Sequence, residues 1–211
     1  AVVSAMERGG VRCAGVDNRL DILIVARAIV NALVGREVAV LAAADAARLP
    51  VGGGTLGGLV YYDVIEHLPA LEASIREADR VARKGGWIAI STPNRFSLSA
   101  EPHSGVWGIG MVPRGWQVAY AGMRSGIVYS GTVLRSAREV ERLVSANSGF
   151  GLEFQVPKLA EEDVRSFGVR RRLMARVYNG VADMGAARRV MLLVGPFFRA
   201  VGRKGVVGGV G

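Results

Sequence analysis

The sequence lacks the features that mark several large classes of protein. It has a single cysteine, Cys13, so no internal disulfide can form, and a reducing cytoplasm fits this cysteine content. No apolar run reaches the ~18 residues that a membrane-spanning helix needs. Hydrophobic residues make up 50% of the 211 residues and charged residues 21%, which excludes a disordered chain. We therefore expect a cytoplasmic globular protein with a sizeable core.

What the sequence does have is a regular alternation of strand and helix patterns. Short apolar, β-branched runs are separated by longer segments whose apolar residues recur with helical spacing. The first half of this pattern predicts a helix over 1–8, a strand over 11–16, a helix over 20–34 and a strand over 37–42. Such alternation is typical of an α/β fold with a doubly wound, mostly parallel sheet.

The stretch 58–94 organises the rest of the chain. It begins with an apolar strand over 59–62 and continues with an amphipathic helix from Leu71 to about Ala82. Lys84-Gly85-Gly86 is expected to end that helix, and a second strand runs over 87–91. Strand, helix, tight turn and strand form a βαβ unit, so the two strands should be parallel neighbours.

Three segments of this stretch carry a family resemblance. They read YYDVIEHLP, then a helix ending in RVARKGG, then WIAISTPN. In this order and spacing they resemble the class I S-adenosylmethionine-dependent methyltransferases, most of all the branch with small-molecule, lipid-precursor and saccharide acceptors. The resemblance covers roughly residues 1–156. It implies a Rossmann-like methyltransferase fold, S-adenosyl-L-methionine as cofactor, and methyl transfer to an oxygen, nitrogen or carbon of the acceptor.

The resemblance also implies cofactor-binding residues after the first two strands. Asp17 matches the family's acidic residue that binds the cofactor ribose, and the neighbouring Asn18 is placed in the same site. Asp45 and Ala46 match a pair that contacts the adenine. From the residues alone, Asp17 could equally cap a helix and Asp45 could form an Asx-turn.

The end of the central strand supplies the candidate residues for chemistry. Tyr62 matches a position that lines the cofactor in the resembled family, largely through its backbone, and Asp63 is assigned to the same site. Asp63, Glu66 and His67 are spaced i, i+3, i+4 and would share one face of a helical turn. Three interpretations stay open: the trio orders the turn, His67 is a general base, or the trio holds a divalent cation. His67 is assigned as the catalytic residue, and no metal is assigned.

The main departure from the family pattern concerns the start of the sequence. Family members place an acidic residue and a loop of the form D-x-G-x-G-x-G after a first strand, and the segment AVVSAMERGG resembles the helix that follows this loop. We therefore expect an N-terminally truncated domain that lacks its first strand and glycine loop. The strands on either side of the missing strand should then have unpaired edges.

A long connection, 95–132, follows the central unit. Connections of this length inside a domain are usually functional, and this one leaves the carboxyl end of a strand, so it should lie over the acceptor site. Residues expected to line that site are His103, Trp107, Trp116, Tyr120 and Tyr129. His103 could also be an ordinary hydrogen-bonded loop residue. A capping box at Ser136 and Glu139 then begins a helix to about residue 146, followed by a strand over 152–156.

The tail, 157–211, differs in composition and is treated as a second region after the methyltransferase domain, 1–156. Between Arg170 and Lys204 there are nine basic residues and one acidic residue, which gives +8 of the chain's net +9. The expected elements are amphipathic helices over 164–178 and 182–194, a last strand over 197–203 and a disordered end over 205–211.

Basic amphipathic helices fit an anionic membrane surface, a phosphate-bearing acceptor or nucleic acid, and a solvated helix face is the alternative. Nucleic acid is disfavoured because no aromatic RNA-binding motif is present. The sequence thus predicts a methyltransferase, cytoplasmic and peripheral at the inner face of the membrane. Two other functions stay open: a catalytically inactive, membrane-associated interaction protein, and a nicotinamide-dependent oxidoreductase.

Overall fold

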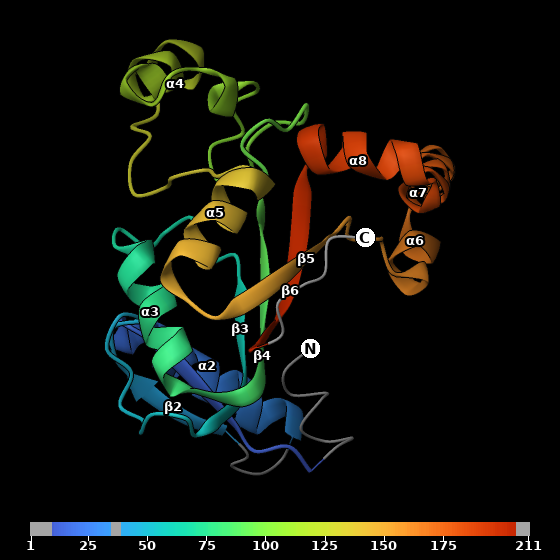
Figure 1. Cartoon of the computed structure of the whole chain (residues 1–211). Helices are drawn as coiled ribbons and strands as arrows, with labels where there is room; N and C mark the ends of the chain where they lie inside the picture. The colour runs from blue at the N-terminus through green and yellow to red at the C-terminus, as the bar shows by residue number, and fades with distance from the viewer. Residues whose placement is uncertain (1–9, 35–38, 206–211) are drawn as a thin grey trace. The chain divides into compact units, whose positions relative to one another are not determined.

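The computed structural model describes residues 10–34 and 39–205. They belong to two compact units, one ending at Gly52 and the other beginning at Gly53 (Figure 1). The expected helix over 1–8 lies outside the described residues, as does most of the expected end over 205–211. The boundary expected after residue 156 stays a prediction.

The first unit is a βαβ unit. It contains strand β1 (Cys13–Asp17), helix α2 (Leu20–Val34) and strand β2 (Ala39–Ala43), and the two strands pair in parallel. The prediction for α2 is confirmed at both ends. Leu23 is the buried hydrophobic residue of this helix, whereas most of its other apolar side chains are exposed. The unit therefore has little core of its own among its described residues.

The second unit contains a four-stranded sheet in the order β3-β4-β6-β5. The strands are β3 (Leu56–Tyr62), β4 (Ala82–Pro93), β5 (Phe150–Gln155) and β6 (Phe197–Lys204). β3 and β4 are parallel neighbours joined by helix α3 (Leu71–Val81), so the predicted βαβ unit is confirmed. β6 is antiparallel to both β4 and β5. The α/β class is confirmed.

The turn between α3 and β4 differs from the prediction. Glycine was expected to end the helix, but α3 ends at Val81 and Ala82 already has extended backbone. Gly85, at φ +70°, lies within β4 instead, where the pairing with β3 shifts register after Leu56. The glycine pair marks an irregularity in the strand rather than a helix cap.

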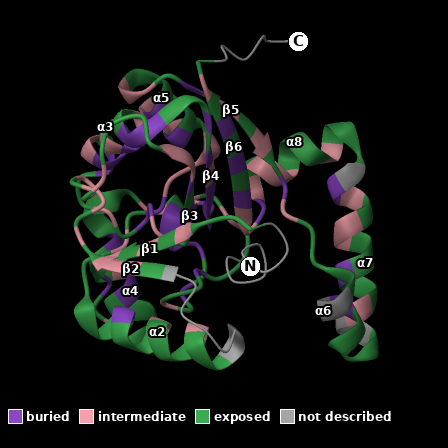
Figure 2. Cartoon of the chain, turned by 90° about the horizontal axis from the view of Figure 1, so that it is seen from below, coloured by how far each residue is buried: buried purple, intermediate pink, exposed green. Residues whose placement is uncertain are grey.

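One face of this sheet is covered by α3 and helix α5 (Ala137–Asn147), which pack against each other (Figure 1). The predicted capping box is present: the Ser136 hydroxyl accepts from the Glu139 N–H, and the Glu139 carboxylate accepts from the Ser136 N–H. Burial is concentrated on the strands (Figure 2). Fully buried side chains on this side include Ile75, Val81, Ile88, Ile90, Val140, Val144 and Phe198.

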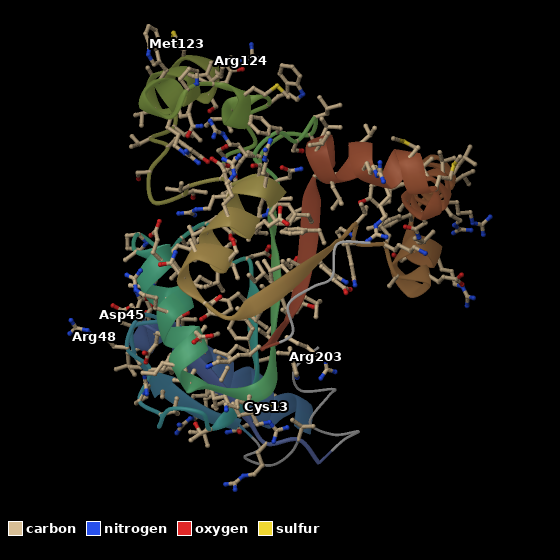
Figure 3. The ribbon with its side chains drawn as sticks, viewed as in Figure 1. Cys13, Asp45, Arg48, Met123, Arg124 and Arg203 are labelled. Atoms are coloured by element: carbon tan, nitrogen blue, oxygen red, sulfur yellow. The ribbon has the colours of Figure 1, made fainter. Side chains whose placement is uncertain are left out.

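The long connection is folded rather than irregular. It forms two short 3-10 turns, η1 (Ile109–Met111) and η2 (Arg114–Trp116), and helix α4 (Gln117–Ser125). These elements bury a small core of their own, made of Val106, Ile109, Ala121, Tyr129 and Leu134. Met123 and Arg124 project from the outer side of α4 (Figure 3). Helix α4 was not predicted. Its nine residues, QVAYAGMRS, carry few large apolar side chains, and no side chain caps its N-terminus.

The tail forms three helices where two were predicted. They are α6 (Glu161–Ser166), α7 (Val169–Asp183) and α8 (Gly185–Val194). The first predicted helix, 164–178, is broken at Phe167 and Gly168, whose backbones are extended. The last strand is confirmed as β6. Over the described part of the chain, every helix is too short or too polar to cross a bilayer.

Asn94, directly after β4, joins the sheet to the tail. Its buried side-chain amide donates to the carbonyl oxygens of Leu192 and Leu193, both at 3.0 Å, and its backbone N–H donates to Pro196. The last carbonyls of a helix have no partners within the helix. Asn94 therefore caps the C-terminus of α8 from the end of β4.

We predict that Asn94→Ala lowers the free energy of unfolding by about 1–3 kcal/mol, because it removes a buried side-chain amide that donates to two carbonyls at the end of α8. Denaturant unfolding followed by circular dichroism measures this loss. Gln155→Ala, at an exposed position of β5, is the control and should change stability by less than about 0.5 kcal/mol. Equal stabilities for Asn94→Ala and the control would show that Asn94 does not hold α8.

Candidate active site

The carboxyl ends of β1 and β2 hold the predicted ribose and adenine residues. Asp17 ends β1, and its Oδ1 accepts from the Arg19 N–H at 2.8 Å. Asp45 comes after β2 on the loop that also carries Arg48 (Figure 3), and its Oδ1 accepts from the Ala47 N–H at 2.8 Å. Both carboxylates thus fix local turns at the same edge of the two-stranded sheet. Asn18 and Ala46 lie next to them.

The carboxyl end of β3, in the second unit, holds the other predicted cofactor residues. Tyr62 is 45% exposed, and the Arg199 guanidinium lies 5.8 Å from its ring centre. Asp63 has φ +50°, unusual for a residue with a side chain, and its N–H donates to Ser91 on β4. The positive φ turns the chain sharply out of the strand. The chain then forms a tight turn at the carboxyl end of β3.

Glu66 lies inside this turn and is 1% exposed. Its Oε2 accepts from the Thr92 hydroxyl at 3.0 Å, and its Oε1 has no hydrogen-bond partner. Burial raises the pKa of Glu66 above its usual value. A buried carboxylate oxygen without a partner is costly, so this atom marks a position where a donor or a cation would be stabilised.

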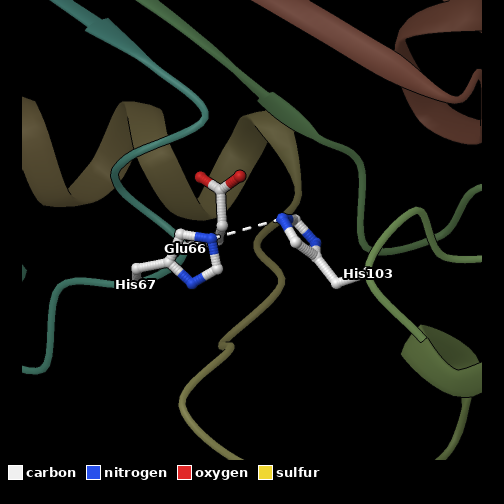
Figure 4. Close-up of side chains that lie close together, drawn as sticks. All are labelled: Glu66, His67 and His103. Carbon is white, nitrogen blue, oxygen red and sulfur yellow. Dashed lines mark hydrogen bonds between the residues drawn. The ribbon is translucent and has the colours of Figure 1, made fainter. Parts of the chain in front are cut away.

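The next residue, His67, meets His103 of the long connection. Their Nε2 atoms are 3.2 Å apart and their rings are nearly perpendicular (Figure 4). His67 Nδ1 lies 3.3 Å from the carbonyl oxygen of Gly131, and His103 Nδ1 lies 2.7 Å from Glu101 Oε1. Since a carbonyl only accepts, His67 carries a hydrogen on Nδ1, and its Nε2 is then a lone-pair acceptor in the neutral ring.

Glu101 holds His103 in place. Its side chain is 2% exposed, and it also accepts from the backbone N–H groups of His103 and Ser104. Burial works to raise the pKa of Glu101, but the hydrogen bonds from Ser104 and His103 outweigh it, and the pKa lies below its usual value. Glu101 is therefore ionised near neutral pH and accepts a hydrogen from His103 Nδ1, which leaves the His103 Nε2 pointing at His67.

The structure changes the predicted grouping of Asp63, Glu66 and His67. Among the described residues, the cluster whose ligand atoms lie within 4.8 Å of one another consists of Glu66, His67 and His103, and Asp63 is not in it. The predicted shared helical face fails because Asp63 adopts a positive φ. His103 was expected to line the acceptor site, but its contact with His67 was not predicted.

The aromatic residues of the connection do not line one pocket. Trp107 and Trp116 are exposed, Tyr120 donates to the Trp107 carbonyl, and Tyr129 is buried in the small core. The hollow beneath this part of the connection measures about 10 Å³, room for about one water molecule. Of the five side chains expected at the acceptor site, only His103 contacts His67 at the carboxyl end of β3.

Comparison with known proteins supports the family resemblance over the first part of the chain. Residues 1–90 match a family described as "Methyltransferase domain". Over these residues the chain is similar to methyltransferase domains. The resemblance to class I S-adenosylmethionine-dependent methyltransferases is thereby confirmed, and with it S-adenosyl-L-methionine as the cofactor. The interpretation as a nicotinamide-dependent oxidoreductase gains no support. No curated protein matches the chain.

Solved structures share the fold at low identity. An S-adenosylmethionine-dependent methyltransferase from Archaeoglobus fulgidus is 14% identical, with a TM-score of 0.54 over 96% of this chain and 80% of that one. The [4+2]-cyclase SpnF is also 14% identical, with a TM-score of 0.59 over 98% and 71%. Phosphoethanolamine N-methyltransferase 2 from Haemonchus contortus, in complex with phosphomonomethylethanolamine and S-adenosylhomocysteine, is 14% identical, with a TM-score of 0.57 over 96% and 46%. These likenesses show the fold and not the acceptor.

We predict that Asp17→Ala weakens S-adenosylmethionine binding by about 1–3 kcal/mol, the scale for losing a charged hydrogen-bond partner. Titration calorimetry measures the change. Asp21→Ala is the matched control: it removes an exposed carboxylate four residues away, which pairs with Arg19 and is not at the strand end. Unchanged affinity in Asp17→Ala would remove this residue from the cofactor site.

Proposed function

We propose that this protein transfers a methyl group from S-adenosylmethionine to a small-molecule, lipid-linked or saccharide acceptor bound at the His67–His103 pair. The observation that carries the proposal is the convergence of the chain's two histidines at the carboxyl end of β3. Ligands of open α/β sheets bind at the carboxyl ends of the strands, and the residues proposed to contact the cofactor, Tyr62 and Asp63, come from the same strand end.

The acceptor atom should be an oxygen or nitrogen that carries a hydrogen. The cofactor's sulfonium makes its methyl group a good electrophile, so the protein must mainly hold the acceptor's lone pair in line with the methyl carbon. Where the acceptor must lose a proton, a group with a pKa near neutrality serves best, and histidine meets this condition. His67 is the proposed catalytic residue, and His103, fixed by Glu101, is proposed to position it.

We expect His67→Ala to lower kcat for methyl transfer by about 10²–10⁴-fold, the range for losing a group that handles the acceptor's proton, with a small effect on cofactor binding. The acceptor is identified first, by mass spectrometry of products formed from cell extract with isotope-labelled S-adenosylmethionine. Each variant is then assayed with that acceptor.

Arg48→Ala, on the exposed loop after β2, is the control and should keep wild-type kcat. A fully active His67→Ala protein would mean that the acceptor needs no help from this residue. The absence of any methylated product would contradict the proposed function itself.

We also propose contact with an anionic membrane surface through α7 and α8. Apolar side chains on both helices are highly exposed, with Leu173 65%, Met174 63%, Val177 58% and Leu193 64% exposed. A helix face that was only solvated would not carry them. Arg176 and Arg189 are exposed on the same two helices, whereas Arg188 donates to the Phe154 carbonyl. Exposed apolar area with exposed cations fits a surface of anionic lipid.

We predict that the protein co-sediments with vesicles containing anionic lipid at low salt, and that added salt weakens the binding by screening the charges. Arg176→Gln with Arg189→Gln should remove about 2 kcal/mol, at about 1 kcal/mol for each cation near the surface. Arg124→Gln, on the exposed end of α4, is the control and should bind as the wild type does. Equal recovery with neutral and anionic vesicles would contradict an electrostatic surface contact.

A further inference from the structure

The His67–His103 contact is unusual because both facing atoms are hydrogen-bond acceptors. Each ring donates a hydrogen bond from its Nδ1. The acceptor is the Gly131 carbonyl for His67 and the Glu101 carboxylate for His103. In two neutral rings so arranged, both Nε2 atoms carry lone pairs, and these atoms are 3.2 Å apart. Two lone pairs at this distance repel each other unless a cation or a proton lies between them.

The spacing of the two nitrogens fits a shared metal ion. Zinc–imidazole bonds of about 2.0–2.1 Å at tetrahedral angles place two ligand nitrogens about 3.3–3.4 Å apart. The observed 3.2 Å is close to this value. Metal-bound histidines generally donate their other ring N–H to a carbonyl or a carboxylate, which fixes the ring and increases its basicity. Gly131 and Glu101 supply these two partners.

A third ligand is provided by Glu66. Its carboxylate is buried, and its Oε1 has no partner. The ligand atoms of Glu66, His67 and His103 all lie within 4.8 Å of one another, and Figure 4 shows the three side chains close together. Bringing the carboxylate to bonding distance requires a shift of at most about 1.5 Å. The orphan oxygen thus points to a ligand at this place rather than to a solvated acid.

Charge and ligand type together select the ion. Two carboxylates, Glu66 and Glu101, and two neutral imidazoles make a site that a divalent cation would neutralise. Imidazole nitrogen favours transition metals such as Zn²⁺, whereas Mg²⁺ and Ca²⁺ prefer oxygen ligands. We infer that Glu66, His67 and His103 form a binding site for one divalent transition-metal ion, with a position left open for a water molecule or an acceptor oxygen.

The place of the ion in the reaction rests on the proposed function. A metal with an open position could bind a hydroxyl oxygen of the acceptor and lower the pKa of that hydroxyl, so that its proton would pass to solvent water without a free imidazole. His67 would then serve methyl transfer as a ligand. Metal binding would depend on Glu66, His67 and His103 and not on the tail or the cofactor residues. It can therefore be measured without an acceptor.

The test is calorimetric titration of the full chain with Zn²⁺ alone, in a buffer that does not bind metal, together with the visible absorption of bound Co²⁺. We expect one ion per chain. Binding should be at least tenfold weaker in His67→Ala, in His103→Ala and in Glu66→Gln. Glu101→Gln should weaken it about 10–100-fold, since it removes the carboxylate that orients His103. Glu153→Gln, at an exposed position of β5, is the control and should bind as the wild type does.

The histidines are exposed, so their variants should fold, and circular dichroism without metal checks this. No Zn²⁺ binding at about 1 mM, or binding that is equal in wild type, His67→Ala and His103→Ala, would overturn the metal site. Metal binding in a protein that methylates nothing would overturn the proposed function and keep the site. Methyl transfer that is unchanged by His103→Ala and by chelation, in a protein that binds no Zn²⁺, would keep the function and overturn the site.

Discussion

The backbone pairing of β6 with both β4 and β5 is the constraint on which the second unit depends. β6 comes from the end of the described chain, yet it lies inside the sheet and supplies buried Phe198 and Ala200 to the core. Its hydrogen bonds to β4 extend from Trp87 to Pro93. Because β6 must reach this position, the chain before it has to pass over the end of the sheet, and Asn94 holds α8 there. The tail is therefore part of the fold and not an appendage.

The connection after β4 brings a second set of polar residues to the same end of the sheet. Its small core around Ile109 and Tyr129 gives it a defined shape, so Glu101 and His103 are held by packing and by backbone hydrogen bonds. The turn after β3 is held by residues on either side of Leu134, a member of that small core, since the Glu66 carbonyl accepts from the Val133 N–H and the Ile65 carbonyl accepts from Arg135. Two segments fixed to the same small core thus face each other through His67 and His103. A site assembled in this way is more rigid than one on a single loop.

Much of the fold could be predicted because it is encoded locally. The 3.6-residue spacing of α2, the βαβ pattern around Leu71 and the capping box at Ser136 each depend on residues close in sequence. The site was less predictable. The trio of Asp63, Glu66 and His67 assumed a helical turn, which the positive φ of Asp63 breaks. His103 reaches His67 only through the folding of a connection with weak local signals, and contacts between residues 36 apart in sequence carry no periodicity.

The position of β6 also has a consequence for how the chain is made. Once the ribosome has released β4, one edge of that strand has no partner until β6 emerges, roughly 110 residues later. At about 5–20 residues per second, this interval is on the order of 5–20 s. During that time Ile88 and Ile90 belong to an unpaired, apolar strand edge, the kind of surface that other chains can pair with. During synthesis this edge of β4 is therefore open to pairing with other chains, and we expect chaperones that cover such an edge to raise the yield in cells.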